Sequence, residues 1–367
     1  MFLNIHNLVR IELLNEPKGV RELLRFRMGG FETNSLDEDP DIRIRFTRHI
    51  ELENKVRFID NETAYGDGSL YIMRGGKKLA IPLKTSEKPR YDVICEAGFS
   101  PIKVHHLMNS FLDQHVLLDK GATFVHAAAV CFNNKGFLFP GWGDAGKTGM
   151  ALALLKEGAE YMTDDLPIIT QDGTILANPV PLNVARYLSV PLLKKTQFRR
   201  DSHYRAAMAK KTTLSILGAI LPKMPLQFIR IIGDGASLRA RQIELIAHVP
   251  FSALSPQGKI RKSVSLDAVF CLTSTGSREI EIEEINDKLT ADRVAYSYLY
   301  LSSEVNRGLY EFLRIASPEL GDILIQHKET KAKEIINKAF KAKPLYYVGV
   351  PRHFDLDQAF NKLVKYL

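Results

Sequence analysis

The chain has 367 residues, of which 45% are hydrophobic and 25% charged, and its formal net charge is +8 at pH 7. This composition is typical of a globular protein and excludes a disordered or fibrous one, and the length favours two domains. The sequence has no apolar run of about 18 residues, so we expect no membrane-spanning segment.

The cysteines and the charge balance indicate the compartment and the partners. Cys95, Cys131 and Cys271 lie far apart and form no C-x-x-C pair, which argues against a zinc cluster or a disulfide framework. The first residues lack a basic segment followed by an apolar block, so we expect no secretory signal and a cytoplasmic location. Because no nucleic-acid motif accompanies the basic residues, we do not expect nucleic-acid binding.

The first part of the chain, residues 1–111, is predicted to be a β-rich domain of unknown role. Residues 42–46 and 55–60 alternate between apolar and polar side chains, as half-buried strands do. Residues 69–83 predict a hairpin that turns at Gly75 and Gly76. A helix over residues 104–121 is expected to join this domain to the next.

The second part, residues 112–367, is predicted to alternate strands and helices. Two strands, 123–132 and 136–141, lead to a glycine-rich loop, and an apolar helix follows the loop and stops at Gly158. Two further strands surround a pair of aspartates. Later segments predict an apolar helix, two strands, a lysine-rich helix with a solvated face, another strand and a last helix, at 212–222, 265–274, 278–285, 328–343, 344–350 and 355–367.

The glycine-rich loop matches the phosphate-binding pattern G-x-x-x-x-G-K-[ST] at every fixed position. Its glycines let backbone N–H groups turn toward a phosphate, and the helix that follows adds its positive N-terminal end. The lysine ammonium can reach the β- and γ-phosphates, and the threonine hydroxyl can bind Mg²⁺. The predicted nucleotide-binding residues are Gly141, Trp142, Gly143, Asp144, Ala145, Gly146, Lys147 and Thr148.

Two further features extend this candidate site. Asp164 and Asp165 follow the loop helix at the end of a short strand, where one carboxylate can bind Mg²⁺ and the other can accept a proton from a hydroxyl. Alternatively, the pair only forms a turn. His126 lies on the strand before the loop strand, and the predicted hairpin brings it beside the loop, either as a catalytic residue or as a core histidine. We therefore predict catalytic roles for Lys147, His126, Asp164 and Asp165.

Together these segments resemble the catalytic domain of bacterial HPr kinase/phosphorylase. The matching segments are H-A-A-A-V at 126–130, the loop at 141–148 and T-D-D at 163–165. The resemblance is specific over about residues 120–180 and implies an α/β fold with an HPr-kinase/PEP-carboxykinase-like P-loop domain. The β-rich N-terminal domain expected before it is not covered by the resemblance. The resemblance also implies ATP and Mg²⁺ as cofactors, with Thr148 and one aspartate on the metal. We expect Asp164 to be the base on the His126 side and Asp165 to be the metal ligand.

The sequence departs from this family in a segment that concerns the acceptor. HPr kinases carry an E-[IV]-R-G-x-G stretch after the aspartate pair, and residues 178–186 of this chain do not match it. The resemblance therefore implies a kinase for another acceptor, and related kinases act on peptide natural products such as lasso-peptide precursors. HPr kinases are hexameric, but this sequence has no interface signature, so homo-oligomerisation stays open.

Two segments could contribute to the acceptor side. Pro179, Pro181 and Arg186 follow the aspartate strand, either as a wall of the acceptor site or as a surface turn. The basic segment 194–211 could be a lid whose Arg199, Arg200 or Arg205 steadies transferred charge, or a solvated helix face.

The sequence thus predicts an ATP-dependent kinase that transfers the γ-phosphate to a hydroxyl of a protein, peptide or small molecule. Two other functions are consistent with the same residues. One is a nucleotide-binding regulator or assembly factor with weak or no phosphotransfer, and the other is a kinase restricted to a small metabolite.

Overall fold

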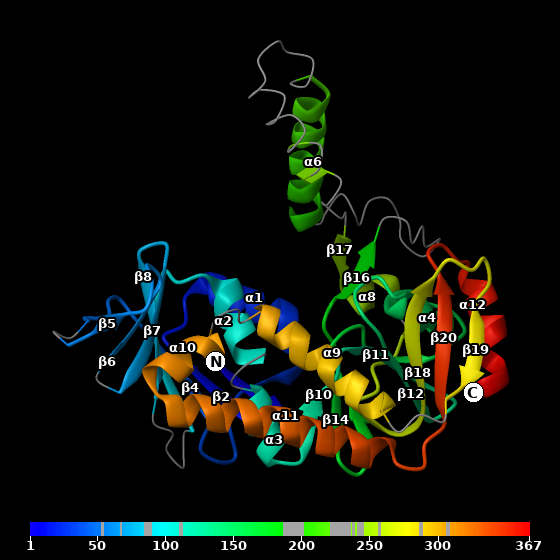
Figure 1. The fold of residues 1–367 in the computed structure, drawn as a ribbon, viewed down its shortest axis with the longest axis horizontal. Helices are drawn as coiled ribbons and strands as arrows, with labels where there is room; N and C mark the ends of the chain where they lie inside the picture. The colour runs from blue at the N-terminus through cyan, green and yellow to red at the C-terminus, as the bar shows by residue number, and fades with distance from the viewer. Residues whose placement is uncertain are drawn as a thin grey trace.

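The computed structural model is a mixed α/β fold with two large sheets, joined by helices that run along one side (Figure 1). Among the described residues, no helix is long and apolar enough to cross a membrane. The structure describes residues 1–52, 55–66, 68–83, 90–109, 113–185, 202–220, 236, 239–240, 246–255, 258–285, 289–305 and 309–367.

The N-terminal sheet has the spatial order β3-β1-β2-β4-β9-β8-β7-β6-β5. Every second residue of β2 and β4 is buried, which is the pattern that predicted the strand at 42–46. The predicted strand at 55–60 is limited to β5, whose two residues are both exposed. The strands are Phe2–Ile5 (β1), Val9–Leu14 (β2), Glu32–Thr33 (β3), Ile42–Thr47 (β4), Arg57–Phe58 (β5), Thr63–Gly66 (β6), Ser69–Arg74 (β7), Lys77–Pro82 (β8) and Tyr91–Glu96 (β9).

The hairpin of β7 and β8 confirms the turn chemistry expected there. Gly75 and Gly76 have φ values of 58° and 72°, and the antiparallel register pairs Arg74 with Lys77 across them. Two consecutive positive φ values are typical of a two-residue hairpin turn, and glycine adopts them without strain.

The helices of this part differ from the prediction. Helix α1 (Lys18–Met28), followed by the short helix η1 (Gly29–Phe31), was not predicted, although Val20, Leu24 and Met28 form its buried face at helical spacing. The helix expected over 104–121 is described as two pieces, α2 (Pro101–Leu107) and α3 (Asp113–Asp119). The chain leaves α3 at Gly121, whose φ is 70°.

The second sheet contains the loop strand, β12, between β18 and β11. Its order is β10-β14-β15-β18-β12-β11-β13, and β20 pairs with both β18 and β19. The strand predicted over 123–132 is divided at Val125 and His126 into β10 and β11. The strands are Ala122–Phe124 (β10), Ala127–Phe132 (β11), Lys135–Pro140 (β12), Glu160–Thr163 (β13), Ile168–Thr170 (β14), Thr174–Leu176 (β15), Ser263–Thr275 (β18), Glu281–Glu284 (β19) and Leu345–Pro351 (β20).

Helices cover both faces of the second sheet. On one face, α4 (Lys147–Lys156) and α12 (Leu356–Leu363) share a core cluster with Phe139 and Phe270. On the other face, α9 (Thr290–Val305) and α11 (Pro318–Phe340) share one with Leu138 and Val269. The predicted loop helix and last helix are therefore confirmed as α4 and α12. The chain ends in a short helix, η4 (Val364–Tyr366).

A small two-stranded sheet packs against α4. It pairs β16 (Leu182–Ala185) with β17 (Ile246–Val249), and α8 (Phe251–Leu254) follows it. Helix α6 (Ser202–Ile220) stands away from the rest of the fold beside this sheet (Figure 1). It joins part of the basic segment and most of the predicted apolar helix in one element.

The two large sheets share a hydrophobic core. Tyr298 of α9, Leu324 of α11 and Leu313 of α10 (Leu309–Ala316) belong to the same buried cluster as Ile11 and Val93 of the N-terminal sheet. Helices from the last third of the chain therefore pack against the first domain. The predicted boundary near residue 111 falls between described residues and stays a prediction.

One lysine of α11 corrects the expected solvated face. Lys331 and Lys338 are exposed, but the Lys328 side chain is only 4% exposed. Its Nζ donates to the Ser302 hydroxyl at 2.6 Å and the Tyr310 hydroxyl at 2.9 Å, and lies over the Tyr310 ring. Burial lowers the pKa of Lys328 to about 7. The face of α11 that carries Lys328 thus belongs to the interior.

Candidate functional site

The glycine-rich loop begins where β12 ends and leads directly into α4. A parallel bridge between Gly141 and Leu272 continues the pairing of β12 with β18 into the loop. Gly146 precedes α4 with a φ of 97°, and a Cβ there would lie 2.9 Å from Val350 Cγ1. Trp142, Gly143 and Asp144 are exposed. The open loop and the N-terminal N–H groups of α4 are therefore arranged as an anion site requires.

The ammonium of Lys147 contacts the loop and the His126 ring. Its Nζ donates to the carbonyl oxygens of Gly141 and Trp142, both at 2.9 Å. The third neighbour of Nζ is Nε2 of His126 at 3.0 Å. Burial lowers the pKa of Lys147, and the nearby aspartates oppose this shift. An ammonium has three hydrogens, so each of them has an acceptor in this arrangement.

His126 is brought to the loop by the hairpin of β11 and β12, as predicted. Asn133 and Asn134 turn the hairpin with φ values of 53° and 60°, and the backbone N–H of Gly141 donates to the His126 carbonyl at 3.4 Å. Burial, with a smaller contribution from Lys147, lowers the pKa of His126 to about 3. The ring is therefore neutral at physiological pH.

A serine from α9 completes the contacts of the His126 ring. Nδ1 of His126 lies 3.1 Å from the Ser297 hydroxyl, and both side chains are buried. Because Nε2 accepts from Lys147, the ring proton is on Nδ1 and is donated to Ser297. Sequence reasoning missed Ser297. Apolar residues at helical spacing, such as Ala291, Val294, Ala295 and Tyr298, could have predicted the helix, but not its contact with His126.

Asp164 lies at the end of β13, on the side of Thr148. Its Oδ2 accepts from the backbone N–H of Asn183 at 2.7 Å, whereas its Oδ1 is buried and has no hydrogen-bond partner among the described residues. Burial raises the pKa of Asp164 to about 6, and hydrogen bonds from Asn183 and the Thr148 hydroxyl act against this shift.

Asp165 lies on the side of His126. Its Oδ1 is 3.9 Å from Nε2 of His126 and, within the described part of the chain, has no hydrogen-bond partner. Burial raises the pKa of Asp165, and the charge of Lys147 is the largest opposing influence. The placement of the two aspartates is therefore the reverse of our expectation, because Asp164 rather than Asp165 lies by Thr148. Adjacent residues at a strand end point to different sides.

The residues present fit a magnesium ion that also binds phosphates. Thr148 and the partnerless carboxylate oxygens offer the hard oxygen ligands that Mg²⁺ prefers. In the described part of the chain, no group of three or more His, Cys, Asp or Glu residues could hold a metal by itself.

Residues from the N-terminal part of the chain also reach this site, which sequence reasoning did not predict. His6 Nε2 lies 2.6 Å from the Ala177 carbonyl oxygen, and a Cβ at Gly30 would lie 3.1 Å from Pro179. The turn after β1 and the short helix η1, which follows α1, therefore lie against the segment that follows the aspartates. Arg27, in the last turn of α1, lowers the pKa of Asp165 through its charge.

The structure describes part of the candidate acceptor side. Pro179 is half-buried and Pro181 is buried. The Tyr161 hydroxyl donates a hydrogen bond to the Val180 carbonyl oxygen between them at 2.6 Å. Arg205 is exposed on α6, which packs against β17. Arg186, Arg199 and Arg200 lie outside the described residues, so their predicted roles are untested.

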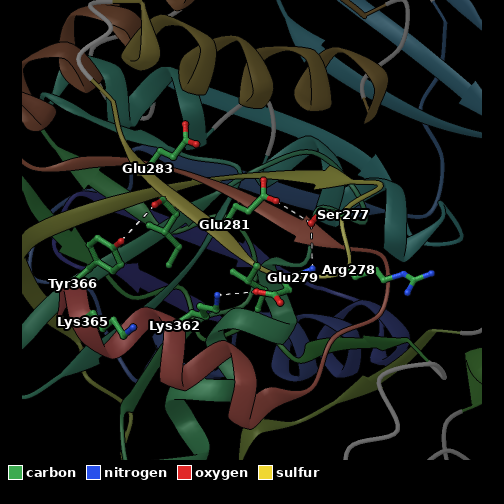
Figure 2. A pocket seen from close by; sticks show the side chains of 10 residues that line it. Ser277, Arg278, Glu279, Glu281, Glu283, Lys362, Lys365 and Tyr366 are labelled. Carbon is green, nitrogen blue, oxygen red and sulfur yellow. Dashed lines mark hydrogen bonds and ion pairs between the residues drawn. The ribbon is translucent and has the colours of Figure 1, made fainter.

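Of two pockets in the described structure, one is lined by residues of the candidate site and the other is not. One, of about 510 Å³, lies between β19 and the C-terminal helices, and Figure 2 shows Lys362 paired with Glu279 and Tyr366 bonded to the strand in this pocket. None of the predicted site residues lines it. The other, of about 220 Å³, is lined by Gly141 and Trp142 of the loop and by Ser297. Only the second pocket adjoins the candidate site.

Comparison of the sequence with protein-family models and with curated proteins gave no match.

Proposed function

We propose that this chain is an ATP-dependent phosphotransferase with an HPr-kinase-like P-loop domain, and that it transfers the γ-phosphoryl group to a hydroxyl. One observation carries the proposal. Two buried carboxylate oxygens without a hydrogen-bond partner in the described structure lie beside the lysine and threonine of a complete phosphate-binding loop. Buried polar atoms are normally satisfied, so orphaned ones at such a loop support a site for further ligands.

The binding half of the mechanism belongs to the loop. Its N–H groups and Lys147 would hold the phosphates and offset the charge that shifts onto them during transfer. Thr148 and Asp164 would hold Mg²⁺, which supplies further charge neutralisation when bound. The contact between His126 and Lys147 keeps the ammonium at the mouth of the loop.

The proton-transfer half belongs to Asp165. Its partnerless Oδ1 would accept the proton of the attacking hydroxyl. Burial raises the pKa of this carboxyl, and the charges of Lys147 and, less strongly, Arg27 oppose the rise and so favour the carboxylate form that a base requires. The acceptor would approach between Asp165 and the end of α1, which gives the N-terminal domain a part in selecting it.

The test is transfer of labelled γ-phosphate from ATP to a host lysate separated into protein and small-molecule fractions. We expect label in one fraction with the wild-type chain, a loss of roughly 10²–10⁴-fold with Asp165→Asn, and no loss with Asp172→Asn, an exposed turn residue. ATP binding without transfer to either fraction would contradict the proposal and favour a nucleotide-binding regulator.

A further inference from the structure

The pocket of about 220 Å³ adjoins the loop and is lined in part by Ser297, which contacts His126. It is lined by Gly141 and Trp142, by Cys271 and Thr273 of β18, and by Tyr347 of β20. In the sheet, β18 and β20 lie on one side of β12, whereas β13, which ends at the aspartates, lies on the other. A nucleotide with its phosphates in the loop and its γ-phosphate near Asp165 would direct its other end toward this pocket.

One residue of the lining has a buried hydroxyl without a partner among the described residues. Thr290, the first residue of α9, lines it, and its side chain is only 3% exposed. The Thr290 Oγ1 is buried and has no hydrogen-bond partner among the described residues. Because buried hydroxyls are normally satisfied, this atom points to a ligand with a polar edge.

The remaining lining suits a flat ring with polar edges. Pro140, Leu272 and Val294 provide apolar walls, and Arg293 is the only charged side chain of the described lining. Trp142 is 54% exposed and makes an edge-to-face contact with Tyr300 of α9, with ring centroids 5.3 Å apart. The indole therefore leans toward α9 and this pocket, where its remaining surface is open to another ring.

The size of the pocket limits what it can hold. Sites for complete drug-sized ligands have volumes of roughly 300–1,000 Å³, and this pocket is smaller. It therefore suits one part of a nucleotide rather than the whole molecule.

We infer that this pocket binds the nucleoside part of the nucleoside triphosphate whose phosphates occupy the loop. The inference rests on the proposed function and adds the subsite that distinguishes a nucleotide from a bare polyphosphate. Thr290 hydrogen-bonds the edge of the base or the ribose, Trp142 contacts the ring, and Arg293 lies beside them.

The experiment uses Trp142, the only tryptophan of the chain, as a fluorescence reporter. The full-length protein is titrated with Mg²⁺ and, separately, ATP, GTP and tripolyphosphate. We expect at least one nucleoside triphosphate to bind about fivefold or more tightly than tripolyphosphate, because contact of a base with an aromatic ring typically contributes this much. Thr290→Val should reduce that advantage and leave tripolyphosphate affinity unchanged.

The matched control is Thr275→Val. The Thr275 hydroxyl is also buried without a partner in the described structure, but Thr275 does not line the pocket. We expect it to bind nucleotides as the wild type does.

Three outcomes would count against the inference. Equal binding of tripolyphosphate and every nucleotide, or equal effects of the two threonine variants, would overturn it while leaving the phosphate loop intact. Absence of binding by tripolyphosphate and nucleotides alike, confirmed by calorimetry, would instead overturn the proposed function on which it rests.

Discussion

The Nζ of Lys147 lies 3.0 Å from Nε2 of His126, and this contact determines what the histidine can do. Burial and the neighbouring ammonium lower the pKa of His126 to about 3, so the ring is neutral and Nε2 is an acceptor. Its other nitrogen donates to Ser297. His126 therefore acts through Lys147, as a positioning residue, rather than as a proton donor to substrate.

Replacing His126 with leucine should weaken ATP binding by about 10- to 100-fold, because a hydrogen bond to a charged group is lost. Ser297→Ala should have a smaller effect, since it removes only the support of the ring. The distinguishing measurement is the pH profile of turnover. Because His126 stays neutral over the physiological range, neither variant should remove a limb near pH 6.5. Loss of such a limb would make His126 a proton-transfer group.

Substitution of Asp164 and substitution of Asp165 should impair turnover in different ways. Asp164→Asn should raise the Mg²⁺ concentration needed for turnover, because Asp164 lies by Thr148. Asp165→Asn should lower turnover by roughly 10²–10⁴-fold at any Mg²⁺ concentration, because it removes the base. Mg²⁺ titrations of transfer activity separate the two. Wild-type behaviour of both variants would reduce the pair to a turn.

Arg27→Ala should shift the acidic limb of the pH profile of turnover. The positive charge of Arg27 lowers the pKa of Asp165, so its removal raises that pKa and moves the acidic limb of turnover to higher pH. ATP affinity should be unchanged. Arg25→Ala is the control, because Arg25 lies on the same helix and pairs with Glu32. Identical pH profiles of turnover for Arg27→Ala and Arg25→Ala would show that the charge of Arg27 does not influence Asp165.

The lowered pKa of Lys328 predicts that the free energy of unfolding depends on pH. Its pKa is about 7 when folded and near its ordinary 10.5 when unfolded, so the unfolded chain binds more protons between these values. Stability therefore rises with pH over this window, by up to about 1.4 kcal/mol per pH unit from this residue.

Lys328→Met should remove that rise between about pH 7 and 9, and denaturant unfolding at several pH values measures it. The control is Lys331→Met on the exposed face of the same helix. A Lys328→Met variant that keeps the wild-type slope would show that burial does not lower the pKa of Lys328 as described.

What could be predicted from the sequence was local. Residues close together in the sequence determine the conformation of the loop and of the hairpin that carries His126. Asn133 and Asn134 form the hairpin turn, and Gly146 supplies the positive φ before the loop helix. The contacts of Ser297 and Arg27 with the site depend on how distant segments pack, which no spacing reveals. Lys328 was placed on a solvated face for the same reason, since Tyr310 and Ser302 come from other helices.

The phosphate-binding role of the loop is the claim on which the other proposals depend, and calorimetric titration of Mg²⁺–ATP into the wild type and Lys147→Ala tests it most directly. The Nζ of Lys147 donates to two loop carbonyls and lies beside His126, and these contacts hold no helix or strand together, so the variant should keep its far-ultraviolet circular dichroism. We expect its ATP affinity to fall by about 10- to 100-fold. Equal ATP affinity in the two folded proteins would contradict the account.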